Sequence, residues 1–122
     1  MQIEVSNGEI VDKFTILEIK KLISTGAVHQ NVVDELSSLE GIVESFDLPR
    51  ELLDDLRSTN KKLWELEDKL RRLESEKRFD AQFVESARSV YRTNDHRFAL
   101  KQQINDLTNS RFREEKIHPD YR

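Results

Sequence analysis

The side chains of this sequence that are best suited to bind a ligand are concentrated in one short polar segment. Residues 91–97 interrupt an apolar repeat with Tyr91, Arg92, Thr93, Asn94, Asp95, His96 and Arg97. An arginine binds a carboxylate or a phosphate through two parallel hydrogen bonds, and tyrosine and asparagine add neutral donors and acceptors. The segment therefore suits an anionic or sugar-like small molecule.

Residues from two earlier segments are expected to lie beside this one. If the chain reverses near Phe79, positions on either side pair when their numbers sum to about 159. This register places three residues next to the polar segment: Asn60, Trp64 and Glu67. Further reversals near Gly26 and Asp47 would bring Glu18 level with Asn60, and the segment of Glu18 also carries Asp12. The sequence thus predicts one polar layer to which three helices contribute residues.

Two interpretations of this layer stay open. It is either a binding pocket, with arginine as the clamp and Trp64 as a wall, or a buried polar layer that fixes helix register. Asparagine on an apolar seam, as at Asn94, has the second role in coiled coils. Ion-pair networks imitate binding sites, and we favour the register interpretation. The ligand-binding candidates are Asn60, Trp64, Glu67, Tyr91, Arg92, Asn94, Asp95, Arg97, Asp12 and Glu18.

Other chemistry has little support in the sequence. The three histidines are too scattered for a metal site, and the acidic pair Glu65 and Asp68 is surrounded by lysine and arginine, as on a solvated helix face. Glycine-rich phosphate loops and the common hydrolase motifs are absent. We therefore predict no metal and no cofactor, and we identify no catalytic residue.

The apolar periodicity predicts the helices that position the layer. Leu56, Leu63 and Leu70 repeat every seven residues, as in a coiled coil. Ser6 and Glu9 are expected to form a capping box at the start of the first helix, and Gly26 is expected to end that helix. Asp47 and Asp80 are expected to cap two further helices. The four expected helices cover about residues 6–24, 28 or 31 to 46, 49–78 and 80–112.

The predicted fold class is all-α, in one domain of residues 1–122. The turn between the two long helices is short, so they must form an antiparallel hairpin, packed with two shorter N-terminal helices in a coiled-coil-like bundle. Residues 1–5 are expected to be a short extended segment and residues 114–122 a C-terminal tail. Leftover apolar surface, including Phe98, Leu100 and Leu107, predicts a homodimer.

The composition indicates where in the cell the protein acts and which classes of partner it binds. The 122 residues include no cysteine, which excludes disulfides and thiolate sites and favours a cytoplasmic location. No apolar run is long enough for a membrane span. The net charge of -4 argues against a nucleic-acid partner.

Two stretches together resemble a known family. The first is Ser6-Asn7-Gly8-Glu9-Ile10-Val11-Asp12-Lys13-Phe14-Thr15-Ile16-Leu17-Glu18-Ile19-Lys20, and the second is Val90-Tyr91-Arg92-Thr93-Asn94-Asp95-His96-Arg97 followed by Lys101, Ile104 and Asn105. Both are similar to segments of a bacterial family of small helical proteins encoded among lipopolysaccharide and other surface-polysaccharide genes. That family has no assigned biochemical activity, so the resemblance implies a setting and no catalytic residues.

These observations lead to three function hypotheses. We favour a non-catalytic helical binding or adaptor protein in surface-polysaccharide biosynthesis, with a protein partner or an anionic or sugar small molecule. The first alternative is an enzyme acting on a nucleotide or nucleotide-sugar through the polar layer. The second is a purely structural oligomerisation element.

Overall fold

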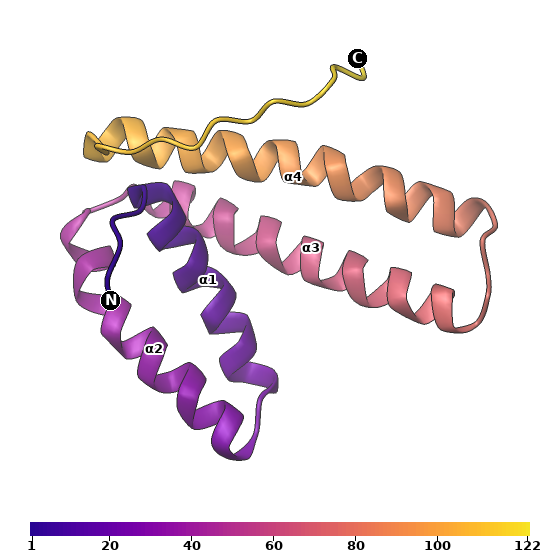
Figure 1. Cartoon of the computed structure of the whole chain (residues 1–122), viewed down its shortest axis with the longest axis horizontal. Coiled ribbons are helices and arrows are strands. Elements are labelled where there is room, and N and C mark those ends of the chain that lie inside the picture. The colour runs from indigo at the N-terminus through magenta and orange to yellow at the C-terminus, as the bar shows by residue number, and fades with distance from the viewer.

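The computed structural model describes residues 1–122 and contains four helices and no strand. The helices are α1 (Asn7–Ile23), α2 (Gly26–Ser45), α3 (Arg50–Ser75) and α4 (Ala81–Thr108). Helices α1 and α2 form one antiparallel hairpin, and α3 and α4 form a longer one. The two hairpins share one end and diverge from it (Figure 1). The all-α prediction and the long second hairpin are confirmed.

Two apolar clusters hold the hairpins together. The larger lies where all four helices meet and contains Val11, Val43, Leu52, Leu56, Leu100 and Ile104. The smaller lies between α1 and α2 and contains Leu17, Val32 and Leu36. Leu100, which we expected on leftover surface, is only 2% exposed because it packs in the larger cluster. Leu107 is exposed as expected, and Phe98 is half-buried.

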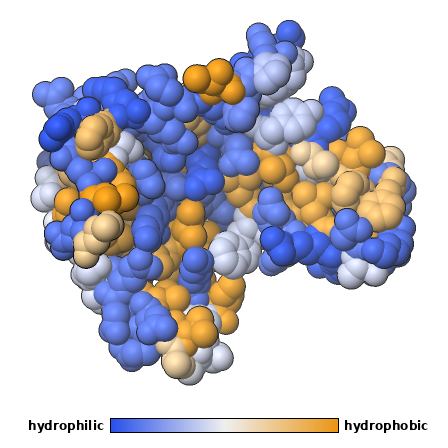
Figure 2. Space-filling model, viewed as in Figure 1, coloured by the Kyte–Doolittle hydropathy of each residue, from blue (hydrophilic) through white to orange (hydrophobic).

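The distal part of the α3–α4 hairpin has no third helix over it. We call residues 61–92 the arm. Leu63 and Leu73 are buried between its two helices, whereas Leu66 and Leu70 are only half-buried. Phe79 and Val84 are about half exposed, at 53% and 52%. Figure 2 shows apolar side chains gathered on the arm, beyond the region that α1 covers.

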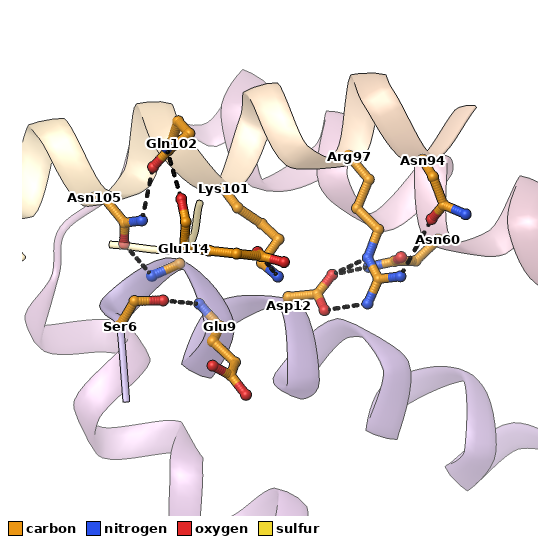
Figure 3. A network of polar contacts seen from close by, with 11 residues as sticks. Ser6, Glu9, Asp12, Asn60, Asn94, Arg97, Lys101, Gln102, Asn105 and Glu114 are labelled. Atoms are coloured by element: carbon orange, nitrogen blue, oxygen red, sulfur yellow. Dashed lines mark hydrogen bonds and ion pairs between the residues drawn. The ribbon is translucent and has the colours of Figure 1, made fainter. Parts of the chain in front are cut away.

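The helix starts follow the capping predictions in part. The Ser6 hydroxyl accepts from the Glu9 N–H at 3.2 Å, but the Glu9 carboxylate points away from Ser6 (Figure 3), so the capping box is half formed. Asp80 caps α4 by accepting from the N–H groups of Gln82 and Phe83. Asp47 does not cap α3, because it adopts a left-handed conformation (φ 47°) that ends α2. Pro49 is the residue that precedes α3.

Left-handed residues also explain why other helix ends differ from prediction. Gly26 was expected to end the first helix, but with φ 62° it begins α2 directly after the reversal at Ser24 and Thr25. Lys77 (φ 56°) stops α3 at Ser75, and Asn109 (φ 56°) stops α4 at Thr108. The long helices therefore end three and four residues earlier than predicted. Residues 1–5 form no strand.

The chain after α4 turns back along that helix. We call residues 110–122 the tail. It contains no helix or strand, and it runs beside α4 towards the arm (Figure 1). The Ser110 N–H donates to the Asn105 carbonyl at 2.9 Å and makes the reversal. The path of the tail places it over the predicted polar segment of residues 91–97.

Candidate functional site

A charged pair joins the two hairpins where α1 crosses α4. Arg97 Nε donates to Asp12 Oδ1 at 2.8 Å, and Nη2 donates to Oδ2, which makes the contact bidentate (Figure 3). The Asp12 side chain is 6% exposed and that of Arg97 is 29% exposed. The hydrogen bonds from Arg97 to Asp12 raise the pKa of Arg97 above its usual value, against the opposing effect of burial. Arg97 is therefore charged over the physiological range.

Helix α3 contributes Asn60 to the same contact. The Asn60 amide donates to Asp12 Oδ1 at 2.9 Å and to the Thr15 hydroxyl at 2.8 Å. That hydroxyl in turn donates to the Asp12 carbonyl at 2.8 Å. Asp12, Thr15 and Asn60 are all buried, so one acidic side chain links helices α1, α3 and α4.

A second contact between α1 and α4 lies nearer the shared end, about one turn from the first on α1 and about two turns on α4. The Gly8 N–H donates to Asn105 Oδ1 at 2.7 Å, and Asn105 is fully buried. A Cβ atom at position 8 would lie 2.5 Å from the Lys101 carbonyl oxygen, so only glycine lets the helices approach this closely. We call the set Gly8, Asp12, Thr15, Asn60, Arg97 and Asn105 the polar junction.

The polar junction has no unmet hydrogen-bonding demand. Every buried side-chain nitrogen and oxygen in the protein has a hydrogen-bond partner. A site that awaits a ligand commonly leaves polar groups converging on an open space, whereas these groups converge on one another. The geometry is that of a clamp between helices, which favours the structural interpretation of this layer.

A separate polar region lies on the outer side of α4, under the tail. Lys101 Nζ pairs with Glu114 at 2.6 Å, and Lys116 Nζ pairs with Asp95 at 2.7 Å. The Tyr91 and Tyr121 rings meet edge to face, with centroids 5.0 Å apart. An open cleft of about 1010 Å³ lies between the tail and residues 91–101 of α4. We call this space the tail cleft.

The structure separates the predicted site residues into three groups. Asp12, Asn60 and Arg97 meet in the polar junction, with Asn94 Oδ1 3.5 Å from Arg97 Nη1 at its edge. Tyr91 and Asp95 face the tail cleft. The other four lie apart: Arg92 pairs with Glu85, Glu18 pairs with Arg57, and Trp64 and Glu67 make no hydrogen bond or ion pair with either region.

An error in the predicted helix register explains part of the separation between these residues. Glu18 was expected level with Asn60, but Asp12 and Thr15 reach Asn60, and Glu18 lies beside Arg57 at 2.9 Å. The hydrogen bonds from Arg57 to Glu18 raise the pKa of Arg57. His96 on α4 contacts Asp55 on α3 at 3.1 Å, so the polar segment lies nearer the shared end than the sum of about 159 places it.

The polar junction brings together the two stretches that the sequence analysis singled out. Gly8, Asp12 and Thr15 come from the first, and Arg97 and Asn105 come from the second. A family model described as a family of unknown function (DUF6165) matches residues 1–119. The chain belongs to this family. Comparison with curated proteins and with solved structures found no match.

Sequence reasoning missed several residues that matter in this family member. Gly8 and Asn105 lie within the two stretches, and Lys101 and Glu114 make the buried end of the tail cleft, yet none of the four was a candidate. The sequence did contain a signal for Lys101. It is a charged residue at a position of the apolar seam, between Phe98 and Ile104. Gly8 gave no signal beyond its place in a capping sequence.

Two further observations concern metal ions and membranes. Nowhere in the chain do three or more histidine, aspartate or glutamate side chains gather in a way that suits a metal ion. None of the four helices combines the length and the apolar character that crossing a bilayer requires.

Proposed function

We propose that this protein is a non-catalytic helical adaptor whose arm pairs with a second copy of the chain. The observation that carries the proposal is the arm itself, a two-helix segment with apolar residues that no other part of the chain covers. Two helices cannot bury apolar stripes as broad as those of a four-helix bundle. Pairing two arms would make such a bundle.

The exposed area supports burial of this surface. The chain exposes 8505 Å², and only 22 of its 122 residues are buried. A folded monomer of 14.4 kDa typically exposes roughly 6,800 Å². The excess of about 1,700 Å² is at least the ~800 Å² that each partner contributes to a standard interface. One arm-to-arm contact would therefore remove a substantial part of the excess.

The charge distribution favours a second copy as the occupant. Residues 61–92 contain nine lysines and arginines and seven acidic residues. Mixed charges of nearly equal number let a twofold axis place opposite charges across the contact. By contrast, residues 1–49 contain nine acidic residues and three lysines, so the α1–α2 hairpin carries most of the negative charge. This acidic hairpin would stay free for another partner.

The setting that we propose is surface-polysaccharide biosynthesis, including that of lipopolysaccharide, in the bacterial cytoplasm. It rests on the resemblance of residues 6–20 and 90–105 to proteins encoded among such genes. A catalytic role is the alternative, and the self-paired polar junction gives it less support than the uncovered arm gives the adaptor. Deleting the gene should alter the lipopolysaccharide band pattern of the host, and the parent sequence should restore it.

Hydrogen exchange at two protein concentrations tests the arm as the contact surface. At a chain concentration of ten times the dimer dissociation constant about one fifth of the chains are monomeric, so arm amides should exchange roughly fivefold more slowly than at high dilution. Val84→Glu places a charge on the proposed contact and should remove this concentration dependence. Leu107→Glu is the matched control, since Leu107 is a similarly exposed residue at the other end of α4.

The two variants also separate the possible outcomes. Val84→Glu should fail to restore the lipopolysaccharide pattern, and Leu107→Glu should restore it. Exchange in the arm that is independent of concentration would contradict the second copy as occupant. Concentration dependence that Leu107→Glu abolishes and Val84→Glu preserves would place the contact at the other end of α4.

A further inference from the structure

A buried lysine under the tail has a single anionic partner. The Lys101 side chain is 11% exposed, and its ammonium lies 2.6 Å from the Glu114 carboxylate (Figure 3). A buried charge requires a counter-charge, because transfer from water into a protein interior is otherwise costly. The tail supplies that counter-charge from a residue that is itself 47% exposed. Lys101 therefore depends on a segment outside the helical core.

Arg97 places a second cation in the tail cleft, because Arg97, Lys101 and Glu114 all line it. The charge of Glu114 contributes to raising the pKa of Arg97, after the larger effect of Asp12. Asp12 is the only carboxylate that binds the Arg97 guanidinium directly. If Glu114 left, Arg97 would keep its partner Asp12, but Lys101 would have no counter-charge, and the tail cleft would hold an uncompensated positive charge.

The tail is held by contacts that are easily exchanged. Beyond residue 113, and apart from the Lys101 pair, the tail is held by Lys116 and Arg122 near Asp95, by Lys116 over the Phe98 ring, by the Tyr121 ring, and by one hydrogen bond from Gln102 to the Glu114 carbonyl. Residues 110–113 have their own contacts, a hydrogen bond from the Asn7 N–H to Ser110 and ion pairs of Arg111 with Glu4 and of Arg113 with Asp106, and they stay in place. Ile117, the aliphatic residue of the tail, is 91% exposed and anchors nothing. Exposed ion pairs contribute little to stability. A competing anion has only the contacts beyond residue 113 to displace.

We propose that Lys101 and Arg97 form an anion-binding site for a phosphate or carboxylate group of a small molecule, and that Glu114 is its built-in occupant. The ligand enters the tail cleft, takes the place of the Glu114 carboxylate on Lys101, and releases the tail beyond residue 113. Phe98, Tyr91 and Asn94 line the cleft and are placed to contact the rest of the ligand. Lys101, Arg97 and Glu114 lie outside the arm, so the anion-binding site can be tested separately from dimerisation.

The test compares two neighbouring glutamates. Glu114→Gln removes the carboxylate from Lys101, whereas Glu115→Gln makes the same change in net charge at a residue that forms no ion pair. The probes are inorganic pyrophosphate for phosphate chemistry and glucuronate for carboxylate chemistry, titrated by calorimetry. If the parent tail is docked about nine-tenths of the time, its release raises the apparent affinity about tenfold. We expect this gain in Glu114→Gln and parent affinity in Glu115→Gln.

Two further measurements locate the binding. Nuclear magnetic resonance of the parent should show the amides of residues 114–122 moving to random-coil positions as the probe binds. The double variant Lys101→Met with Glu114→Gln should lose binding, and the glutamate pair decides the question even if this variant does not fold. The tighter of the two probes identifies the chemistry of the ligand.

Three results would overturn the proposal. The first is equal affinity of Glu114→Gln and Glu115→Gln. The second is no binding of either probe to Glu114→Gln up to ~10 mM. The third is binding to the parent that leaves the tail amides unmoved.

Discussion

Arg97 on α4 binds both carboxylate oxygens of Asp12 on α1, although the two residues are 85 positions apart in the chain. With Asn60 on α3, this pair ties together the two hairpins next to the larger apolar cluster. Beyond the pair the hairpins diverge, and the arm continues without α1. The pair therefore fixes where the covered part of the protein ends and the uncovered arm begins.

Breaking this pair should destabilise the fold substantially. Asp12→Ala leaves the Arg97 guanidinium and the Asn60 amide without their acceptor. We expect a loss of about 3 kcal/mol in the free energy of unfolding, the lower end for a buried pair, because Arg97 keeps some contact with water. Urea unfolding measures it. Glu35→Gln, which breaks the exposed pair of Glu35 with Lys13, is the control and should cost less than ~1 kcal/mol. Equal losses in the two variants would contradict the clamp.

The two helical glycines should respond to alanine in opposite directions. At Gly8 the added Cβ would lie 2.5 Å from a backbone oxygen of α4, so the helices must separate and the hydrogen bond to Asn105 weakens. At Gly41 the Cβ meets nothing within 4 Å, and replacing a helical glycine by alanine stabilises by roughly 0.5–1 kcal/mol. Thermal unfolding should therefore show a lower midpoint for Gly8→Ala and a higher one for Gly41→Ala. A neutral Gly8→Ala would show that the close approach is not required.

Tail docking should have an acid limit and an alkaline limit. Hydrogen bonds from Lys116 and then Tyr121 lower the pKa of Asp95 from its ordinary 3.8, and the hydrogen bond to Asp95 raises the pKa of Tyr121 from 10.0. Because the pKa of Asp95 is lower in the docked state, ionised Asp95 stabilises docking fully above pH 3.8. This stabilisation is lost as the pH falls through the lowered pKa of docked Asp95. Because the pKa of Tyr121 is higher in the docked state, its protonated phenol stabilises docking fully below pH 10.0. This stabilisation is lost as the pH rises through the raised pKa of docked Tyr121.

Nuclear magnetic resonance of Tyr121 against pH measures both limits. We expect docked-state signals throughout the neutral range and released signals at either extreme. Asp95→Asn removes the carboxylate on which both effects depend, and its Tyr121 signals should resemble the released state even at neutral pH. Tyr121 signals in that variant that match the docked parent would contradict the role of Asp95.

Local patterns predicted the elements well because their causes are local. The leucine repeat at residues 56, 63 and 70 indicated a long helix, and the caps at Ser6 and Asp80 follow from side chains that reach the backbone three residues away. The helix ends at Lys77 and Asn109 were missed, because a left-handed residue there need not be glycine.

Contacts between distant residues were predicted less well. The pairing of Arg97 with Asp12 depends on three successive chain reversals. An error of one helical turn at each reversal changes which acidic residue of α1 is expected to lie beside Asn60 and Arg97. This is why Glu18 was expected where Asp12 lies. The return path of the tail, which creates the tail cleft, has no periodicity to reveal it, because residues 110–122 form no regular element. Its contacts with Lys101 and Asp95 follow from the fold of α4 and the turn at Asn109.

The adaptor account depends most on the arm being covered by a second copy. Sedimentation equilibrium of the unmodified chain over a wide range of concentration tests this directly, since it returns mass without assuming shape. We predict a mass that rises with concentration from 14.4 kDa to twice that value, with no larger species, because a twofold contact closes on itself. A mass that stays at 14.4 kDa up to ~100 μM, a concentration at which even weak specific dimers form, would contradict the account.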